Sequence, residues 1–106
     1  MDQNELIEIL KAGFIEWRKH VFQRLAEPDI TQDEVIHILT SGEQIEDYSD
    51  DKPYPCALFL GWIEDKPLHV LVILDEMNRL AYIITAYEPS LEYFEFDFKT
   101  RRKKPG

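Results

Sequence analysis

Apolar residues are concentrated in the middle of the chain, between Tyr54 and Tyr87. This stretch holds three β-rich runs separated by two short polar breaks, so it predicts three antiparallel strands in a meander. Side chains alternate along a strand, and in all three runs both alternating sets are largely apolar. Such a sheet is covered on both faces. One cover is expected from preceding helices, and the other from the C-terminal residues, a partner or a second copy.

The N-terminal third shows helical spacing instead. Residues Asn4 to Ala12 predict an amphipathic helix that Gly13 ends. Apolar residues also recur at helical spacing through Gly13, which leaves one long helix open, because an interior glycine costs only about 1 kcal/mol relative to alanine. We favour a break, with Phe14 to Trp17 extended and a second helix from Arg18 to Glu27.

A third helix has the clearest local signal. Thr31 and Glu34 have the spacing of a capping box at its start, and Gly42 is placed to end it. The following residues, Glu43 to Tyr48, alternate with Ile45 inward and predict an edge strand. The fold class is therefore α+β, with two to three N-terminal helices packed on a four-stranded antiparallel meander sheet.

The C-terminal residues repeat an aromatic at every second position. Phe94, Phe96 and Phe98 alternate with acidic residues, a pattern that allows a fifth strand, a clamp over the open sheet face or an arm into a neighbouring subunit. The chain then becomes strongly basic from Lys99 to Lys104. We expect a single α+β domain over residues 1–98 and a flexible basic tail over residues 99–106.

The charge is uneven. The 106 residues carry a net charge of −9, but five of the twelve basic residues lie in the tail, so residues 1–98 carry −14. A surface that acidic repels RNA and DNA, which disfavours a general nucleic-acid binder.

Other signals bound the class of protein. There is no charged-then-apolar leader, and no apolar run approaches the roughly 20 residues that span a membrane, so we expect a soluble cytoplasmic protein that does not contact membranes. The lone Cys56 lies in a strand pattern and is expected to be a buried thiol. No cofactor or metal is predicted, because the chain has no Cys/His zinc cluster and no glycine-rich phosphate loop.

Candidate chemistry rests on a few side chains. His20 and Arg24 are one helical turn apart and could bind a phosphate or carboxylate; alternatively, Arg24 pairs with Glu27 and His20 is a solvated helix residue. His69 lies mid-strand, where a histidine is ordinarily a hydrogen-bonded core residue. Tyr87 and Thr85 share strand parity and could line a shallow polar pocket near it.

Several linked motifs together resemble a known family. The order and spacing match domain-of-unknown-function family 4258, which is similar to the RelE-like superfamily of small α+β proteins whose toxin members cleave RNA and pair with antitoxins. The resemblance implies that His20, Arg24, His69 and Tyr87 are motif positions. It rests on these segments: His20-x-x-x-Arg24-Leu25-Ala26-Glu27, Ile30-Thr31, Gly42-Glu43-x-Ile45-Glu46-x-Tyr48, Pro53-Tyr54-Pro55-x-x-Leu58, Leu60-Gly61, Pro67-Leu68-His69-Val70 and Ile83-Ile84-Thr85-Ala86-Tyr87-x-Pro89.

Two functions follow as expectations. The first is a non-catalytic protein-interaction module that binds a protein partner or forms a homodimer. The second is a toxin–antitoxin-type endoribonuclease, in which His20 or His69 transfers protons, Arg24 holds the phosphate and Tyr87 orients it. In that case Arg101 and Arg102 would recruit backbone phosphates. A weaker reading is an acidic, antitoxin-like partner of a basic protein.

Overall fold

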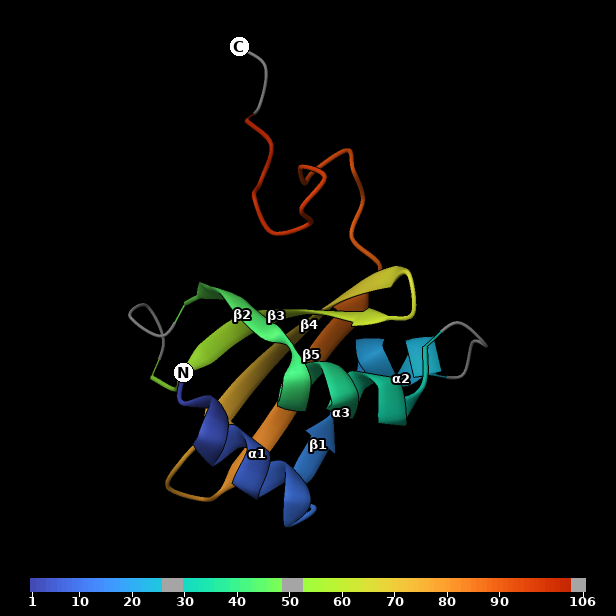
Figure 1. Cartoon of the computed structure of the whole chain (residues 1–106). Coiled ribbons are helices and arrows are strands. Elements are labelled where there is room, and N and C mark those ends of the chain that lie inside the picture. The colour runs from blue at the N-terminus through green and yellow to red at the C-terminus, as the bar shows by residue number, and fades with distance from the viewer. Residues whose placement is uncertain (26–29, 49–52, 104–106) are drawn as a thin grey trace.

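The computed structural model describes residues 1–25, 30–48 and 53–103. In this part of the chain the helices precede the main strands, as in an α+β fold (Figure 1). The elements are α1 (Gln3–Lys11), β1 (Ile15–Trp17), α2 (Lys19–Leu25), α3 (Gln32–Ser41), β2 (Glu43–Asp47), β3 (Cys56–Ile63), β4 (Lys66–Asp75) and β5 (Leu80–Tyr87). The predicted fold class is confirmed.

The strands form one sheet in the order β1-β5-β4-β3-β2. Strands β2 to β5 are sequential antiparallel neighbours, so the predicted four-stranded meander is confirmed. The extended piece predicted before α2 becomes a further strand, β1, which pairs in parallel with β5 and places Ile15 opposite Ala81. Three residues are too few to show a period-two pattern, which is why the sequence predicts the extended piece but not its pairing.

The first helix ends where the glycine predicts. Asp2 caps α1 by accepting hydrogen bonds from the amides of Asn4 and Glu5 at 3.0 and 3.3 Å. Gly13 follows the helix with a φ of +82°, in the left-handed region that favours glycine. The chain turns there and enters β1. The predicted break is confirmed, and the single long helix is wrong.

The capping box of α3 is present. The Thr31 Oγ1 accepts from the Glu34 amide at 3.1 Å, and the Glu34 carboxylate accepts from the Thr31 amide at 2.8 Å. Val35, Ile38 and Leu39, which share one face of α3, are fully buried. Helix α3 therefore starts where its sequence predicts.

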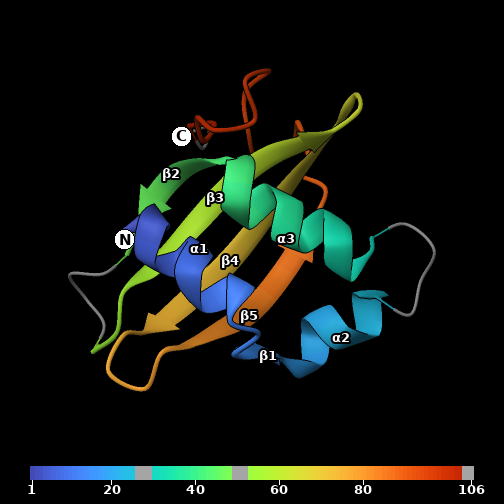
Figure 2. The same cartoon turned by 60° about the horizontal axis from the view of Figure 1, so that its bottom comes forward.

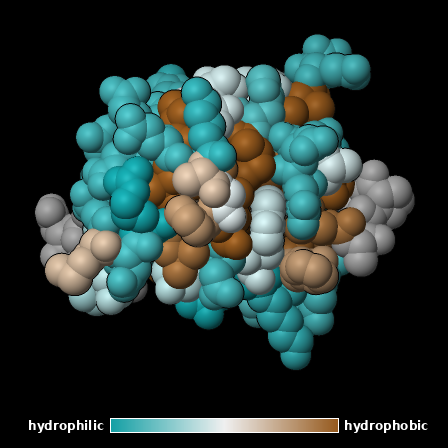
Figure 3. All heavy atoms as spheres, turned by 90° about the horizontal axis from the view of Figure 1, so that it is seen from below, coloured by the Kyte–Doolittle hydropathy of each residue, from teal (hydrophilic) through white to brown (hydrophobic). Residues whose placement is uncertain are grey.

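Helices α1 and α3 lie across one face of the sheet, while α2 packs beside β5 (Figure 2). The core lies between these layers, where apolar helix residues meet every second residue of the strands. Seen from the helix side, the surface is largely hydrophilic, with smaller hydrophobic areas between (Figure 3). Core residues include Leu6, Ile9, Val21, Val35, Ile38, Leu39, Ala57, Phe59, Leu68, Val70, Val72, Leu74, Ala81 and Ile83.

The opposite face of the sheet is covered in part by residues 90–103, here called the C-terminal segment (Figure 1). Phe94 is 3% exposed, and its ring meets the His69 ring edge to face at 4.7 Å between centroids. The Phe98 ring packs against Trp62 in the same geometry at 5.8 Å. The chain's own C-terminal residues thus supply the second cover that the apolar pattern predicts.

The fifth C-terminal strand is wrong. Residues Phe94 to Phe98 form turns, with a single bridge from Phe94 to Arg101. A strand would place Phe94, Phe96 and Phe98 on one face, yet Phe96 is 78% exposed. The cause is Asp97, which accepts hydrogen bonds from the amides of Lys99 and Thr100 and so turns the chain.

Contacts with the domain continue past residue 98, where the predicted tail begins. Lys99 pairs with Glu43 at 3.3 Å, and Arg101 pairs with Glu46 at 2.8 Å, both on the edge strand β2. The flexibility of the tail stays a prediction, and residues 104–106 lie outside the described part. Among the described residues, no helix is both long and apolar enough to cross a membrane.

Candidate functional site

A pocket of about 280 Å³ lies between α2 and the end of β5. We call it the α2–β5 pocket. Its lining residues are His20, Gln23, Arg24, Thr85, Ala86 and Tyr87. Three of the four predicted catalytic candidates, His20, Arg24 and Tyr87, thus come together at one place.

The helical side of the pocket follows from the spacing along α2. His20, Gln23 and Arg24 are three and four residues apart, so they share one face of the helix. Val21 is fully buried in the core and holds the helix against β5. His20 is exposed and Arg24 is half-buried. Glu27, the alternative partner expected for Arg24, lies outside the described residues.

The strand side depends on an irregularity in β5. The register between β4 and β5 shifts between Leu71 and Val72. On the side of the shift toward the end of β5, Leu71 lies opposite Thr85 and His69 lies opposite Tyr87. The bulge keeps Thr85 and Tyr87 on the same side of the sheet as His69. The shared parity inferred for Thr85 and Tyr87 therefore holds, and both residues line the pocket.

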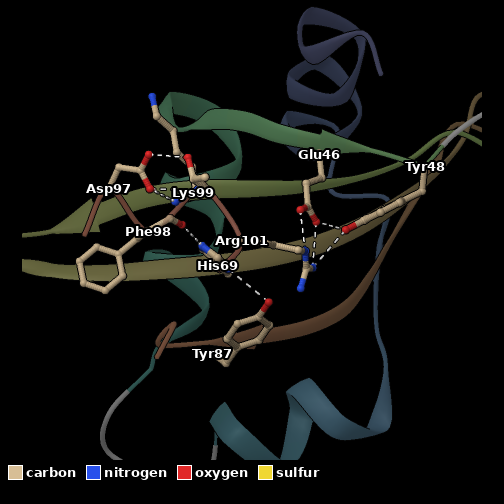
Figure 4. A network of polar contacts seen from close by, with 9 residues as sticks. Glu46, Tyr48, His69, Tyr87, Asp97, Phe98, Lys99 and Arg101 are labelled. Carbon is tan, nitrogen blue, oxygen red and sulfur yellow. Dashed lines mark hydrogen bonds and ion pairs between the residues drawn. The ribbon is translucent and has the colours of Figure 1, made fainter. Parts of the chain in front are cut away.

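His69 is fully buried and lies next to Tyr87, which forms part of the strand side of the pocket. Its Nε2 is 2.6 Å from the Phe98 carbonyl oxygen, and its Nδ1 is 3.2 Å from the Tyr87 hydroxyl (Figure 4). The Tyr87 ring also meets the imidazole edge to face at 5.3 Å. His69 is thus linked to the α2–β5 pocket through Tyr87.

Burial shifts the pKa values of this pair in opposite directions. It lowers the pKa of His69, although the hydrogen bond to Phe98 and the charge of Glu46 oppose this. It raises the pKa of Tyr87. Near neutral pH the imidazole is therefore uncharged and the phenol keeps its proton. With both ring nitrogens engaged, His69 is a hydrogen-bonded core histidine.

The two arginines predicted to recruit phosphates are both in ion pairs. Arg101 donates to both carboxylate oxygens of Glu46, at 2.8 and 3.0 Å, and Tyr48 contacts the same carboxylate (Figure 4). Arg102 donates to Glu95 at 2.9 Å. The Arg101–Glu46 pair anchors the C-terminal segment to β2, and the Arg102–Glu95 pair links two residues within that segment.

The helical side of the pocket is locally basic in an acidic chain. From residue 18 to residue 24 the sequence carries Arg18, Lys19 and Arg24 beside His20, with no acidic residue. Arg18 also lies over the Tyr82 ring at 4.7 Å. The pocket therefore offers cationic and neutral hydrogen-bond donors to an anion. No group of three metal-ligating side chains occurs within the ranges that the structure describes.

Some contributors were not predicted. Gln23 is three residues from His20, and that helical spacing was the available signal. The Phe98 carbonyl carries no signal in the sequence, because it depends on the turn at Asp97. Glu46 lies in the predicted edge strand, but nothing in the local pattern indicates that Arg101, from a distant part of the chain, donates to it.

The model of the family described as domain of unknown function (DUF4258) matches residues 17–88. The chain belongs to this family. The match runs from the end of β1 through β5 and includes both sides of the α2–β5 pocket, whereas the C-terminal segment lies beyond it. Neither the curated proteins nor the solved structures contain a match to this DUF4258 chain.

Proposed function

We propose that this DUF4258 domain is a cytoplasmic protein-interaction module that binds an anionic group of its partner in the α2–β5 pocket. The observation that carries the proposal is the convergence of His20, Gln23 and Arg24 with Thr85 and Tyr87. A guanidinium and an imidazole on one helix face suit a carboxylate or phosphate oxygen, and Gln23 and Thr85 add neutral donors.

Binding is favoured over catalysis by the state of His69. Both of its nitrogens are in hydrogen bonds and the side chain is fully buried, so it does not reach a ligand. His20 then remains as the imidazole in the pocket. A homodimer through the apolar sheet face has less support, because the C-terminal segment occupies part of that face.

Inorganic phosphate is the first probe for the pocket. Titration followed by NMR should shift the imidazole signals of His20, while those of His37, exposed on α3, stay in place. Arg24→Ala should weaken phosphate affinity at least about tenfold, since hydrogen bonds to charged groups contribute about 1.5–3 kcal/mol. Equal shifts of His20 and His37, or an unchanged affinity in Arg24→Ala, would contradict an anion site here.

A second candidate is RNA cleavage of the RelE-like type, favoured because three motif positions of the resemblance line one pocket. His20 would accept the proton of the ribose 2′-hydroxyl, whose oxygen bonds to phosphorus to give a 2′,3′-cyclic phosphate. The bond from phosphorus to the 5′-oxygen breaks, and that oxygen takes a proton from solvent water. Arg24 would hold the phosphate, and Tyr87, after releasing its hydrogen bond to His69, would donate one to the phosphate. The acidic body, and the ion pairs of Arg101 and Arg102, oppose RNA binding.

Cleavage assays separate the two candidates. Free RNA and translating ribosomes are incubated with the wild type, His20→Ala and Arg24→Ala, and the products are mapped. Cleavage by the wild type that either substitution reduces would favour the nuclease. Equal, negligible cleavage by all three would remove it and leave the interaction module.

A further inference from the structure

A chain of hydrogen bonds joins the C-terminal segment to the wall of the α2–β5 pocket. The Phe98 carbonyl contacts His69 Nε2 at 2.6 Å, and His69 Nδ1 contacts the Tyr87 hydroxyl at 3.2 Å. Tyr87 in turn lines the pocket. Figure 4 shows the imidazole between the two partners, with Phe98 on one side and Tyr87 on the other.

The direction of each bond follows from its partners. A carbonyl oxygen can only accept, so His69 Nε2 carries the proton and donates to Phe98. In the uncharged imidazole Nδ1 is then an acceptor, so the Tyr87 hydroxyl donates to it. The position of the Phe98 carbonyl thereby fixes the imidazole, and the imidazole holds the single hydroxyl proton of Tyr87 away from a ligand in the pocket.

A local turn places that carbonyl. Asp97 Oδ1 accepts from the amides of Lys99 and Thr100 at 3.0 and 2.9 Å, and Oδ2 accepts from the Thr100 hydroxyl at 2.7 Å. Phe98 adopts a φ of +58°, which few residues other than glycine adopt without such support. The same segment is anchored by the buried ring of Phe94 and by the Arg101–Glu46 ion pair.

We propose that His69 is a positioning residue through which the C-terminal segment lowers the anion affinity of the α2–β5 pocket. This rests on the proposed function, because it assigns the pocket an anionic ligand. The family match ends at residue 88, so the segment that sets the pocket lies outside the matched region. The affinity of the pocket would accordingly depend on residues after 88.

Asp97→Ala tests the coupling with inorganic phosphate as the probe. Loosening the turn should release the Tyr87 proton for the anion and strengthen phosphate affinity about fivefold, the equivalent of one neutral hydrogen bond. Loss of a negative charge also strengthens phosphate binding, so the charge effect is measured separately. Asp65→Ala, which removes an exposed acid from the β3–β4 turn, is the matched control and should strengthen binding less.

Two further readouts separate positioning from a merely structural role. Phosphate should shift the ¹⁵N signals of the His69 ring in the wild type, because coupling between sites is reciprocal, and this response should shrink in Asp97→Ala. Tyr87→Phe has no hydroxyl proton to release, so the double variant should lose the gain in phosphate affinity that Asp97→Ala alone gives.

The outcomes distinguish this inference from the proposed function. Wild-type binding at His20 with an affinity gain in Asp97→Ala no larger than in Asp65→Ala, or with a gain that the double variant keeps, would overturn the coupling alone. Absence of phosphate binding by the wild type would overturn the proposed function and the coupling with it. Stronger binding by Asp97→Ala than by Asp65→Ala, abolished by Tyr87→Phe, would support both.

Discussion

At the scale of single residues, His69 shows how position changes the role of a reactive side chain. Its place mid-strand predicts a hydrogen-bonded core histidine, and the structure agrees. The resemblance also makes it a motif position, and here the geometry adds the link to Tyr87. The sequence identifies the residue but not its partners, because the bulge in β5 and the turn at Asp97 decide which groups reach the imidazole.

The buried imidazole should make folding stability depend on pH. Because the pKa of His69 is lowered in the folded state, the unfolded chain takes up the proton first as the pH falls below about 6.5. This contribution is complete above pH 6.5 and is lost toward the folded pKa, at no more than about 1.4 kcal/mol per pH unit. Urea unfolding between pH 8 and pH 5 should show the loss.

Two variants define the contribution of His69. His69→Gln should reduce the fall in unfolding free energy over that range, while His37→Gln, which changes an exposed histidine on α3, should leave it as in the wild type. A wild-type slope that His69→Gln does not alter would show that another group causes the pH dependence.

Asp97 should titrate abnormally for an exposed acid. Hydrogen bonds from the Thr100 hydroxyl and the amides of Thr100 and Lys99 lower its pKa to about 2. Its contribution to stability is therefore present above about pH 4 and is lost as the pH falls toward 2. The carboxyl ¹³C shift measures this pKa directly. Thr100→Ala should move it toward 3.8, and a normal value in the wild type would contradict the turn geometry.

At the scale of elements, local signals predict more than non-local ones. The capping box at Thr31 and the glycine after α1 are local chemistry, and both define helix ends in the structure. Strand β1 and the turn at Asp97 depend on pairing or on hydrogen bonds that override alternation. The three phenylalanines illustrate this, since their period-two spacing is real but the backbone between them is not extended.

The packing of α3 on β3 gives a prediction at this scale. A Cβ on Gly61 would lie 2.4 Å from Ile38 Cδ1 and 3.3 Å from its Cα, so the missing side chain permits the close approach of helix and strand. Gly61→Ala should lower the unfolding free energy by about 1–3 kcal/mol through overpacking. Urea denaturation measures it, with Asp65→Ala expected to stay within about 0.5 kcal/mol. An unchanged midpoint would mean that Ile38 moves aside at little cost.

At the scale of the whole molecule, the uneven charge of the chain has a structural counterpart. The C-terminal basic residues face acids on β2, as Lys99 pairs with Glu43 and Arg101 with Glu46. Exposed ion pairs contribute little each, about 0–1 kcal/mol, and salt screens them. Most of the docking energy of the segment must therefore come from burial of its aromatic side chains.

This argument predicts unequal effects for two phenylalanines of the C-terminal segment. Phe94 is 3% exposed and Phe96 is 78% exposed, although their sequence environments are alike. Phe94→Ala removes a buried ring from the sheet face beside His69 and should lower the unfolding free energy by about 3 kcal/mol. Phe96→Ala, the matched control, should change it by no more than about 0.5 kcal/mol.

Denaturation and amide hydrogen exchange together show whether the segment folds with the domain. If it belongs to the same cooperative unit, Phe94→Ala should shift the denaturation midpoint. Amide exchange should then become faster to the same extent in β3, β4 and residues 90–103. If only residues 90–103 lose protection and the midpoint is unchanged, the segment undocks separately from the sheet. That result would place the boundary between an independent domain and its tail near the end of β5, whereas the sequence predicts it after residue 98. Equal losses of unfolding free energy in Phe94→Ala and Phe96→Ala would contradict the unequal burial on which the prediction rests.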